Sequence, residues 1–271
     1  MSKLKQRTIA AAIMIPLALI VIFLLSVNVF CLITGVILLV AAWEWANIAD
    51  LSWQPLRIFY ALITGALLFF SSKAEGYGFF LGTGFAWWIL AVMFILSYPE
   101  SKKAWQPKIV KLIIGWLVLI PAWQALVFIR TRENGAVALL CLFSIIWIAD
   151  IAAYFFGNWF GRHKLLVQVS PGKTWQGAIA AAVIVAIGSA VVAKIAGGFS
   201  WFYLVGISVA SVVIVAFSIA GDLLESMFKR ERGIKDSSNI IPGHGGLLDR
   251  IDSLTAAAPV FAIFLSVLTG F

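Results

Sequence analysis

Long apolar runs alternate with short polar segments along nearly the whole chain. A helix needs about 20 mostly apolar residues to cross the hydrocarbon core of a bilayer. Runs of about that length predict nine spans, at residues 9–25, 29–46, 58–70, 77–96, 109–129, 136–156, 178–196, 201–220 and 251–271. The third run is the shortest and gives the weakest signal. The pattern predicts an all-α polytopic membrane protein with about nine transmembrane helices.

Composition agrees with this pattern. Of the 271 residues, 62% are hydrophobic and 12% are charged, and the mean hydropathy is +1.02. A soluble enzyme would carry about 25% charged residues, so this class is excluded. Cys31 and Cys141 both lie inside apolar runs, where thiols behave as small hydrophobic groups. They indicate neither a disulfide framework nor a metal site.

Basic residues set the expected orientation. Lys3, Lys5 and Arg7 precede the first apolar run, and a second run follows it without a polar start, so we expect a retained anchor rather than a cleaved signal. With the N-terminus inside, sixteen of the twenty lysines and arginines fall in inside segments and four fall outside. The net charge of +8 therefore reflects topology, and we expect no nucleic-acid partner.

Two inside loops differ from the others in content. The first, residues 157–177, carries Ser170, Lys173 and Thr174 in a segment rich in proline and glycine. A P-loop would need a glycine five residues before Gly172, where Val167 stands, so that interpretation fails. A lysine and two hydroxyls still suit phosphate binding. Taken alone, the loop is better explained as an ordinary turn with orienting charges.

The second loop begins near residue 222 and is the longest polar run in the chain. It mixes five basic with six acidic residues up to residue 253, which suits a site where a divalent metal meets anionic phosphates. If the preceding helix continues past the bilayer, Asp222, Glu225, Ser226 and Lys229 share one of its faces. The alternative is a solvated connector, and the density of glycines and paired carboxylates argues against it.

The far end of this loop has its own pattern. Asp249 and Asp252 would share the first turn of the last helix, where the helix dipole favours carboxylates. Glycines at 243, 245 and 246 would let backbone amides approach an anion closely. His244, between them, either donates to a phosphate or fixes the turn. It lacks a partner histidine, which argues against a role as metal ligand.

The fixed positions of the second loop resemble the signature of phosphatidate cytidylyltransferases, also called CDP-diacylglycerol synthases. They read Ser226-x-x-Lys229-Arg230, Lys235-Asp236, Pro242-x-His244-Gly245-Gly246 and Asp249-Arg250-x-Asp252. An upstream region that starts at Asp150 and includes Ser170-Pro171-x-Lys173-Thr174 is similar to the same family. Gln176 departs from the glutamate that many relatives carry. The resemblance covers about residues 147–253, and the first half agrees in hydropathy only.

The resemblance implies transfer of the cytidylyl group of CTP to phosphatidate, which gives CDP-diacylglycerol and pyrophosphate. It implies Mg²⁺ held by Asp222 and Asp249, and a second, monovalent cation is left open. The catalytic residues would be Asp222, Asp249, Lys229, Arg230 and Lys235. The substrate-binding residues would be Ser170, Lys173, Thr174, Ser226, Asp236, His244, Gly245, Gly246, Arg250 and Asp150. Expected partners are CTP, phosphatidate and membrane lipids, with a homodimer left open.

Two carboxylates lie within predicted spans, where an unpaired charge is costly. The resemblance makes Asp150 a wall of the active-site cavity. Glu44, between Trp43 and Trp45, belongs to no motif. A carboxylate at the inside interface, next to an aromatic belt, explains it at least as well as a functional role does.

We therefore expect N-terminal transmembrane helices over 1–135, with about five spans, and a catalytic region over 136–271 with cytoplasmic loops 157–177 and 222–250. The active-site cavity would face the cytoplasm from a bacterial inner membrane. One alternative is a CTP-dependent polyprenol or dolichol kinase, in which CTP gives its γ-phosphate. Another is a transporter, whose polar residues would be scattered at mid-membrane on broken helices. Here they gather in two loops, which argues against transport.

Overall fold

The computed structural model describes residues 15–74, 76–241, 243 and 245–269. Within these residues eight helices are long and apolar enough to span a membrane: α2 (Val27–Ile48), α3 (Gln54–Lys73), α4 (Gly78–Leu96), α6 (Lys108–Arg130), α7 (Gly135–Phe160), α8 (Trp175–Gly197), α9 (Trp201–Arg232) and α10 (Leu248–Thr269). The all-α prediction is confirmed. Residues 9–14 of the first predicted span lie outside the described residues, and residues 15–23 of it are helical.

The third predicted span is confirmed and is longer than its apolar run. Helix α3 has 20 residues and includes Ser71 and Ser72 near its end. Both hydroxyls donate to backbone carbonyls three residues earlier, at 2.8 and 2.7 Å. Because these bonds satisfy the hydroxyls locally, the polar residues do not end the helix.

Helix α9 continues well beyond its apolar run. It has 32 residues and ends at Arg232, after which Gly233 takes a φ of 75° that suits a glycine C-cap. The predicted continuation of this helix beyond its apolar run is therefore confirmed. Helix α10 starts at Leu248, so Asp249 and Asp252 lie in its first turns as expected.

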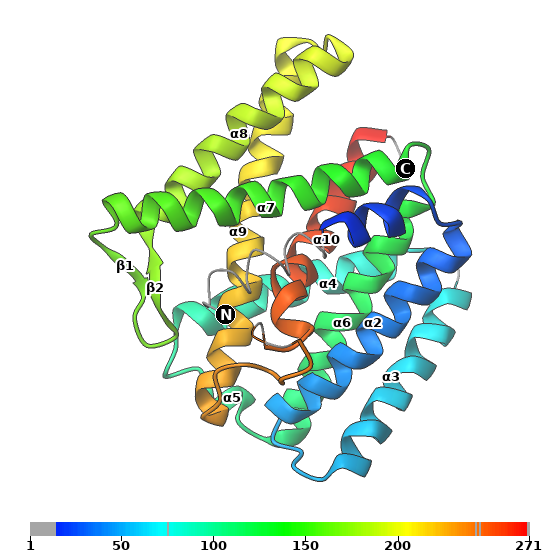
Figure 1. Cartoon of the computed structure of the whole chain (residues 1–271), viewed down its shortest axis with the longest axis vertical. Helices are drawn as coiled ribbons and strands as arrows, with labels where there is room; N and C mark the ends of the chain where they lie inside the picture. Colours follow the sequence, from blue (N-terminus) through cyan, green and yellow to red (C-terminus); the bar gives the residue numbers. More distant parts are fainter. Residues whose placement is uncertain (1–14, 75, 242, 244, 270–271) are drawn as a thin grey trace.

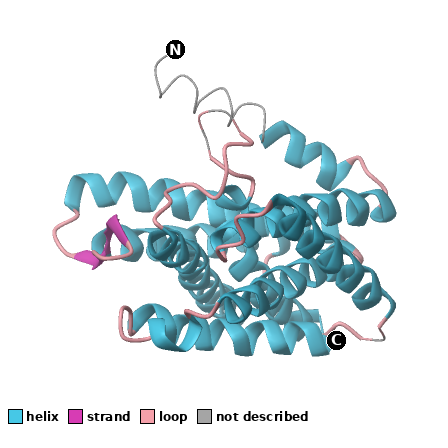
Figure 2. Ribbon diagram, turned by 90° about the horizontal axis from the view of Figure 1, so that it is seen from below, coloured by secondary structure: helices cyan, strands magenta, loops and turns pink. Residues whose placement is uncertain are grey.

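Helices α9 and α10 cross at close range near the centre of the molecule (Figure 1). Gly221 makes this possible, because a Cβ there would lie 2.4 Å from the backbone oxygen of Asp252. Helices α2, α4 and α6 pack against α10. Figure 2 shows a mostly helical fold with the two strands at one side. Helix α8 and the first half of α9 extend beyond the other helices.

A short antiparallel hairpin connects α7 to α8. Its strands are β1 (Lys164–Leu166) and β2 (Ser170–Thr174), and Lys164 pairs with Thr174. The hairpin falls within the loop predicted at 157–177, which therefore has more regular structure than a turn. It lies beside α7 and reaches α9.

Charged residues join three segments that the basic-residue pattern assigns to one side of the membrane. Asp50, after α2, lies 2.9 Å from Lys108 and 3.2 Å from Arg232. The hydrogen bond from Lys108 lowers the pKa of Asp50. Lys102, on the short helix α5 (Lys102–Trp105), lies 2.8 Å from Glu231. The segments expected on the inside thus share one face of the fold.

Candidate functional site

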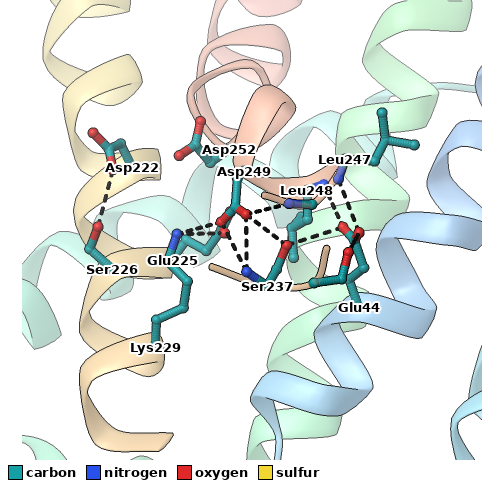
Figure 3. A network of polar contacts seen from close by, with 12 residues as sticks. Glu44, Asp222, Glu225, Ser226, Lys229, Ser237, Leu247, Leu248, Asp249 and Asp252 are labelled. Atoms are coloured by element: carbon teal, nitrogen blue, oxygen red, sulfur yellow. Dashed lines mark hydrogen bonds and ion pairs between the residues drawn. The ribbon is translucent and has the colours of Figure 1, made fainter. Parts of the chain in front are cut away.

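A buried lysine joins α9 to α10. The Lys229 ammonium lies 3.0 Å from Glu225 Oε1, one turn earlier on α9, and 2.6 Å from Asp249 Oδ1 on α10 (Figure 3). The side chains of these three residues are at most 10% exposed. Two buried carboxyl groups thus share one ammonium.

Asp249 is bound on both oxygens. Its Oδ1 accepts from Lys229, and its Oδ2 accepts from the Ser237 amide at 3.0 Å, the Ser237 hydroxyl at 3.1 Å and the Gly246 amide at 2.7 Å. An ionised carboxylate offers about four lone-pair sites, so these donors occupy the acceptor sites of the Asp249 carboxylate. The loop before α10 is thereby folded around this carboxylate.

Asp222 brings the two predicted loops together. Its Oδ2 lies 2.6 Å from the ammonium of Lys173 on β2, and its Oδ1 accepts from Ser226 at 3.1 Å. A second contact joins the same elements, because Arg230 donates to the backbone oxygen of Val169 at 3.3 Å. Residues about fifty positions apart in the sequence therefore form one site, as the resemblance implied.

The end of the hairpin is held by side chains that serve local structure. The Thr174 hydroxyl accepts from the Gly177 amide at 3.2 Å and caps α8, and Thr174 is only 5% exposed. Gln176 accepts from the amides of Arg162 and His163, at 3.1 Å each. A contact between Thr174 and the substrate stays a prediction, because the Thr174 hydroxyl caps α8 in this structure.

A small cavity of about 100 Å³ opens between α7 and α10. Asp150 lines it together with Asp249, Arg250, Asp252, Ser253 and several apolar residues. Pockets for whole small molecules measure about 300–1,000 Å³. This cavity therefore has room for a phosphoryl group but not for a nucleotide.

Other predicted residues lie at the edge of the site. Arg230, Lys235 and Asp236 are exposed, and Asp236 lies close to Gly245. Gly245 has a φ of 82°, and its carbonyl accepts from Ile241 to close the turn. His244 lies outside the described residues. Ser170 is part of β2 and half-buried.

The list of expected site residues omits three that the structure places at its centre. The sequence places Glu225 on the shared face of α9, and its spacing of four from Lys229 is a usual ion-pair signal. Ser237 is fully buried between two carboxylates. Glu44, whose role the sequence leaves open, is fully buried and binds the loop before α10.

The donor type at this site fits Mg²⁺, which takes oxygen ligands. Carboxylates from three helices gather there: Asp150, Asp222, Glu225, Asp249 and Asp252. Among the described residues, no three acidic, histidine or cysteine side chains form a ready metal cage. Asp222 keeps lone pairs beyond its two contacts, whereas a metal on Asp249 would have to displace Lys229. Metal binding by Asp222 and Asp249 stays a prediction.

Comparisons with known proteins cover almost the whole chain. The sequence model described as "Cytidylyltransferase family" matches residues 5–268. A phosphatidate cytidylyltransferase of Pseudomonas aeruginosa is 42% identical over 97% of this chain and 97% of its own length. Proteins of the same name from Haemophilus influenzae and Brucella suis are 38% and 34% identical, over 96% and 97% of this chain and 98% and 94% of their own lengths.

Proposed function

Because the chain belongs to the cytidylyltransferase family, we propose that it transfers the cytidylyl group of CTP to phosphatidate. The products are CDP-diacylglycerol and pyrophosphate. The observation that carries this function is the ion pair of Lys173 with Asp222, which assembles the two family motifs into one site. Full-length relatives with the name phosphatidate cytidylyltransferase support the choice of substrates.

In this reaction a phosphate oxygen of phosphatidate attacks the α-phosphorus of CTP. A new phosphorus–oxygen bond forms while the bond to the β-phosphate oxygen breaks, and pyrophosphate leaves. Both reactants are anions, so positive charge must offset their repulsion. Exposed Arg230, Lys235 and Arg250 surround the site and suit the nucleotide phosphates. Mg²⁺, held by Asp222 and Asp249, would add charge at the reacting phosphates.

The size and polarity of the cavity between α7 and α10 suggest which substrate group it would bind. Phe143, Ile146 and Trp147 provide an apolar wall. The polar lining consists of Asp150, Asp249, Arg250, Asp252 and Ser253. We assign the phosphate of the lipid to this cavity beside Arg250, because its volume of about 100 Å³ admits a phosphoryl group. Mg²⁺ would be needed there to offset the three carboxylates. The nucleotide then binds on the exposed side of the loop.

Product analysis tests the function. Purified protein with radiolabelled CTP and phosphatidate is expected to give a labelled nucleotide diphospho-lipid, and the reaction is expected to require magnesium. A lipid labelled only from the γ-phosphate of CTP, with CDP released, would instead identify a lipid kinase. The two outcomes differ in which phosphorus is attacked.

We expect selection of CTP or dCTP over other nucleotides. No described residue visibly reads the cytosine edge, so this expectation rests on the family alone. Competition binding with CTP, UTP and ATP measures it. Equal affinities for all three would remove the basis for cytidylyl transfer.

We further propose that the protein lies in a bacterial inner membrane with this site facing the cytoplasm. The sixteen-to-four distribution of basic residues supports that orientation. Cysteines placed at 103, 164 or 235, after replacement of Cys31 and Cys141, are expected to resist an impermeant thiol reagent in intact cells. A cysteine at 132 should react. Labelling of 164 or 235 from outside would contradict the orientation.

A further inference from the structure

We propose that Glu44 is a positioning residue, which holds the loop between α9 and α10 so that Asp249 stays within reach of Lys229. The proposal rests on the proposed function, since it concerns the same site. Glu44 lies on α2, about two hundred residues from its partners in the sequence. It has no place in the motifs of the catalytic half.

Glu44 binds four donors of one loop. Its Oε1 accepts from the Leu247 amide at 3.0 Å and from the Ser238 hydroxyl. Its Oε2 accepts from the Leu248 amide at 2.6 Å (Figure 3). It also lies 3.2 Å from the Ser237 hydroxyl, whose single proton it shares with Asp249. The side chain is fully buried. A buried carboxylate is costly unless donors surround it, and here all of them come from residues 237–248.

Two of these donors belong to the start of α10. Leu248 is the first residue of that helix, and the first amides of a helix have no partners within it. A carboxylate at this end satisfies the amides and also interacts favourably with the helix dipole. Glu44 thus caps α10 from another helix and fixes the position of its first turn, which carries Asp249.

Ser237 connects Glu44 to the ion pair. Its hydroxyl lies 3.2 Å from Glu44 Oε2 and 3.1 Å from Asp249 Oδ2, and its amide donates to the same Asp249 oxygen. Asp249 in turn lies 2.6 Å from Lys229. A shift of Glu44 would therefore move a direct partner of Asp249.

Packing around Glu44 supports the same role. Asn47, one turn further along α2, donates to the Ser237 carbonyl at 3.0 Å. A Cβ on Gly246 would lie 2.6 Å from Glu44 Oε1, so only glycine admits the carboxylate here. Trp45 packs on Phe228, the neighbour of Lys229, with ring centroids 5.5 Å apart. Helix α2 therefore contacts both α9, which carries Lys229, and the loop that binds Asp249.

Glu44→Gln tests the proposal. Glutamine has nearly the same shape, but its amide group would face a backbone N–H where the carboxylate oxygen accepted one. We expect turnover, normalised to folded protein, to fall about tenfold or more, with KM values for both substrates within about threefold. Hydrogen exchange should rise in residues 236–249 and stay unchanged in α3 and α4.

Thr34→Val is a matched control on the same helix. Thr34 is buried, and its hydroxyl accepts from the Trp123 indole at 3.2 Å, so the variant also loses a buried hydrogen bond in α2. We expect its turnover to stay within about threefold of the wild type, with unchanged exchange in residues 236–249. A loss equal to that of Glu44→Gln would mean that any damage to α2 has this effect, and would overturn the proposal.

Ser238→Ala covers the case in which Glu44→Gln does not fold. It removes one donor to Glu44 and leaves every contact of Asp249 in place. We expect faster exchange at the start of α10 and a two- to fivefold loss of turnover. Wild-type turnover and exchange in the folded variants, or exchange raised throughout the protein, would overturn the positioning role.

Absence of CDP-diacylglycerol from the wild type would reject the proposed function, while the exchange measurements would still test Glu44.

Discussion

Asp222→Asn and Asp249→Asn are each expected to lower turnover at least about a hundredfold, equivalent to roughly 3 kcal/mol of transition-state stabilisation. Asparagine keeps the shape and removes the charge. At 222 it weakens the contact with Lys173 at 2.6 Å, which joins the hairpin to α9. At 249 it weakens the contact with Lys229. Each variant would also lose one proposed ligand of Mg²⁺.

The measurement compares turnover at saturating CTP across a magnesium titration, in protein whose elution profile shows that it is folded. Lys173→Met separates two roles of Asp222. If the only role of the Asp222 carboxylate were to hold Lys173, Lys173→Met would lose as much turnover as Asp222→Asn. The two variants would then also have the same magnesium dependence. Calorimetry of Mg²⁺ binding to the variants gives a readout that does not depend on activity.

Asp252→Asn is the control for this pair. The Asp252 carboxylate accepts from the amide of Ser253, the next residue, at 2.7 Å, so an amide oxygen can replace it. We expect a smaller loss than at 222 or 249. Near-normal turnover of both Asp222→Asn and Asp249→Asn, with unchanged magnesium dependence, would move the metal elsewhere. Asp150, which lines the cavity, would then be the first candidate.

Lys229→Met is expected to lower the stability of the folded protein by about 3–5 kcal/mol. The lysine is the shared cation of Glu225 and Asp249, and all three are buried. Glu225 Oε2 is already buried without a hydrogen-bond partner among the described residues. Without the ammonium, two carboxylates would face each other at the crossing of α9 and α10.

Thermal denaturation in detergent, followed by the fraction of monodisperse protein, measures this effect. The double variant Lys229→Met with Glu225→Gln should recover part of the loss, because it removes one of the two buried carboxyl groups that lose their cation. Lys164→Met, on the exposed edge of the hairpin, should behave like the wild type. An unchanged melting temperature for Lys229→Met would show that water or other cations neutralise the site.

Much of the helical arrangement follows from the sequence, because a bilayer admits few alternatives to a long apolar helix. Polar residues at helix ends were harder to place. Ser71 and Ser72 lie outside the predicted third span, although their hydroxyls bond back to the helix. The spacing of Asp222, Glu225 and Lys229 correctly predicted a shared face of α9.

The candidate site could be predicted only where its residues are close in the sequence. A threonine before a helix serves equally well as a cap or as a phosphate ligand, so Thr174 was ambiguous. Glu44 gave no signal of its role, because its four donors lie about two hundred residues away and two of them are backbone amides. Hydropathy shows that burying such a carboxylate in an apolar segment is energetically unfavourable. It does not show which segment supplies the hydrogen-bond donors.

The unbroken course of α9 has a consequence for how two immiscible reactants meet. Eight residues separate Asp222 from Arg230, which corresponds to about 12 Å along the helix axis. The headgroup layer on one side of a bilayer is only about 5–8 Å thick. In the proposed orientation, α9 would therefore carry the proposed site residues from the hydrocarbon edge to the aqueous phase on one continuous helix. The lipid would keep its tails dissolved in the membrane and the nucleotide would stay in water throughout the reaction.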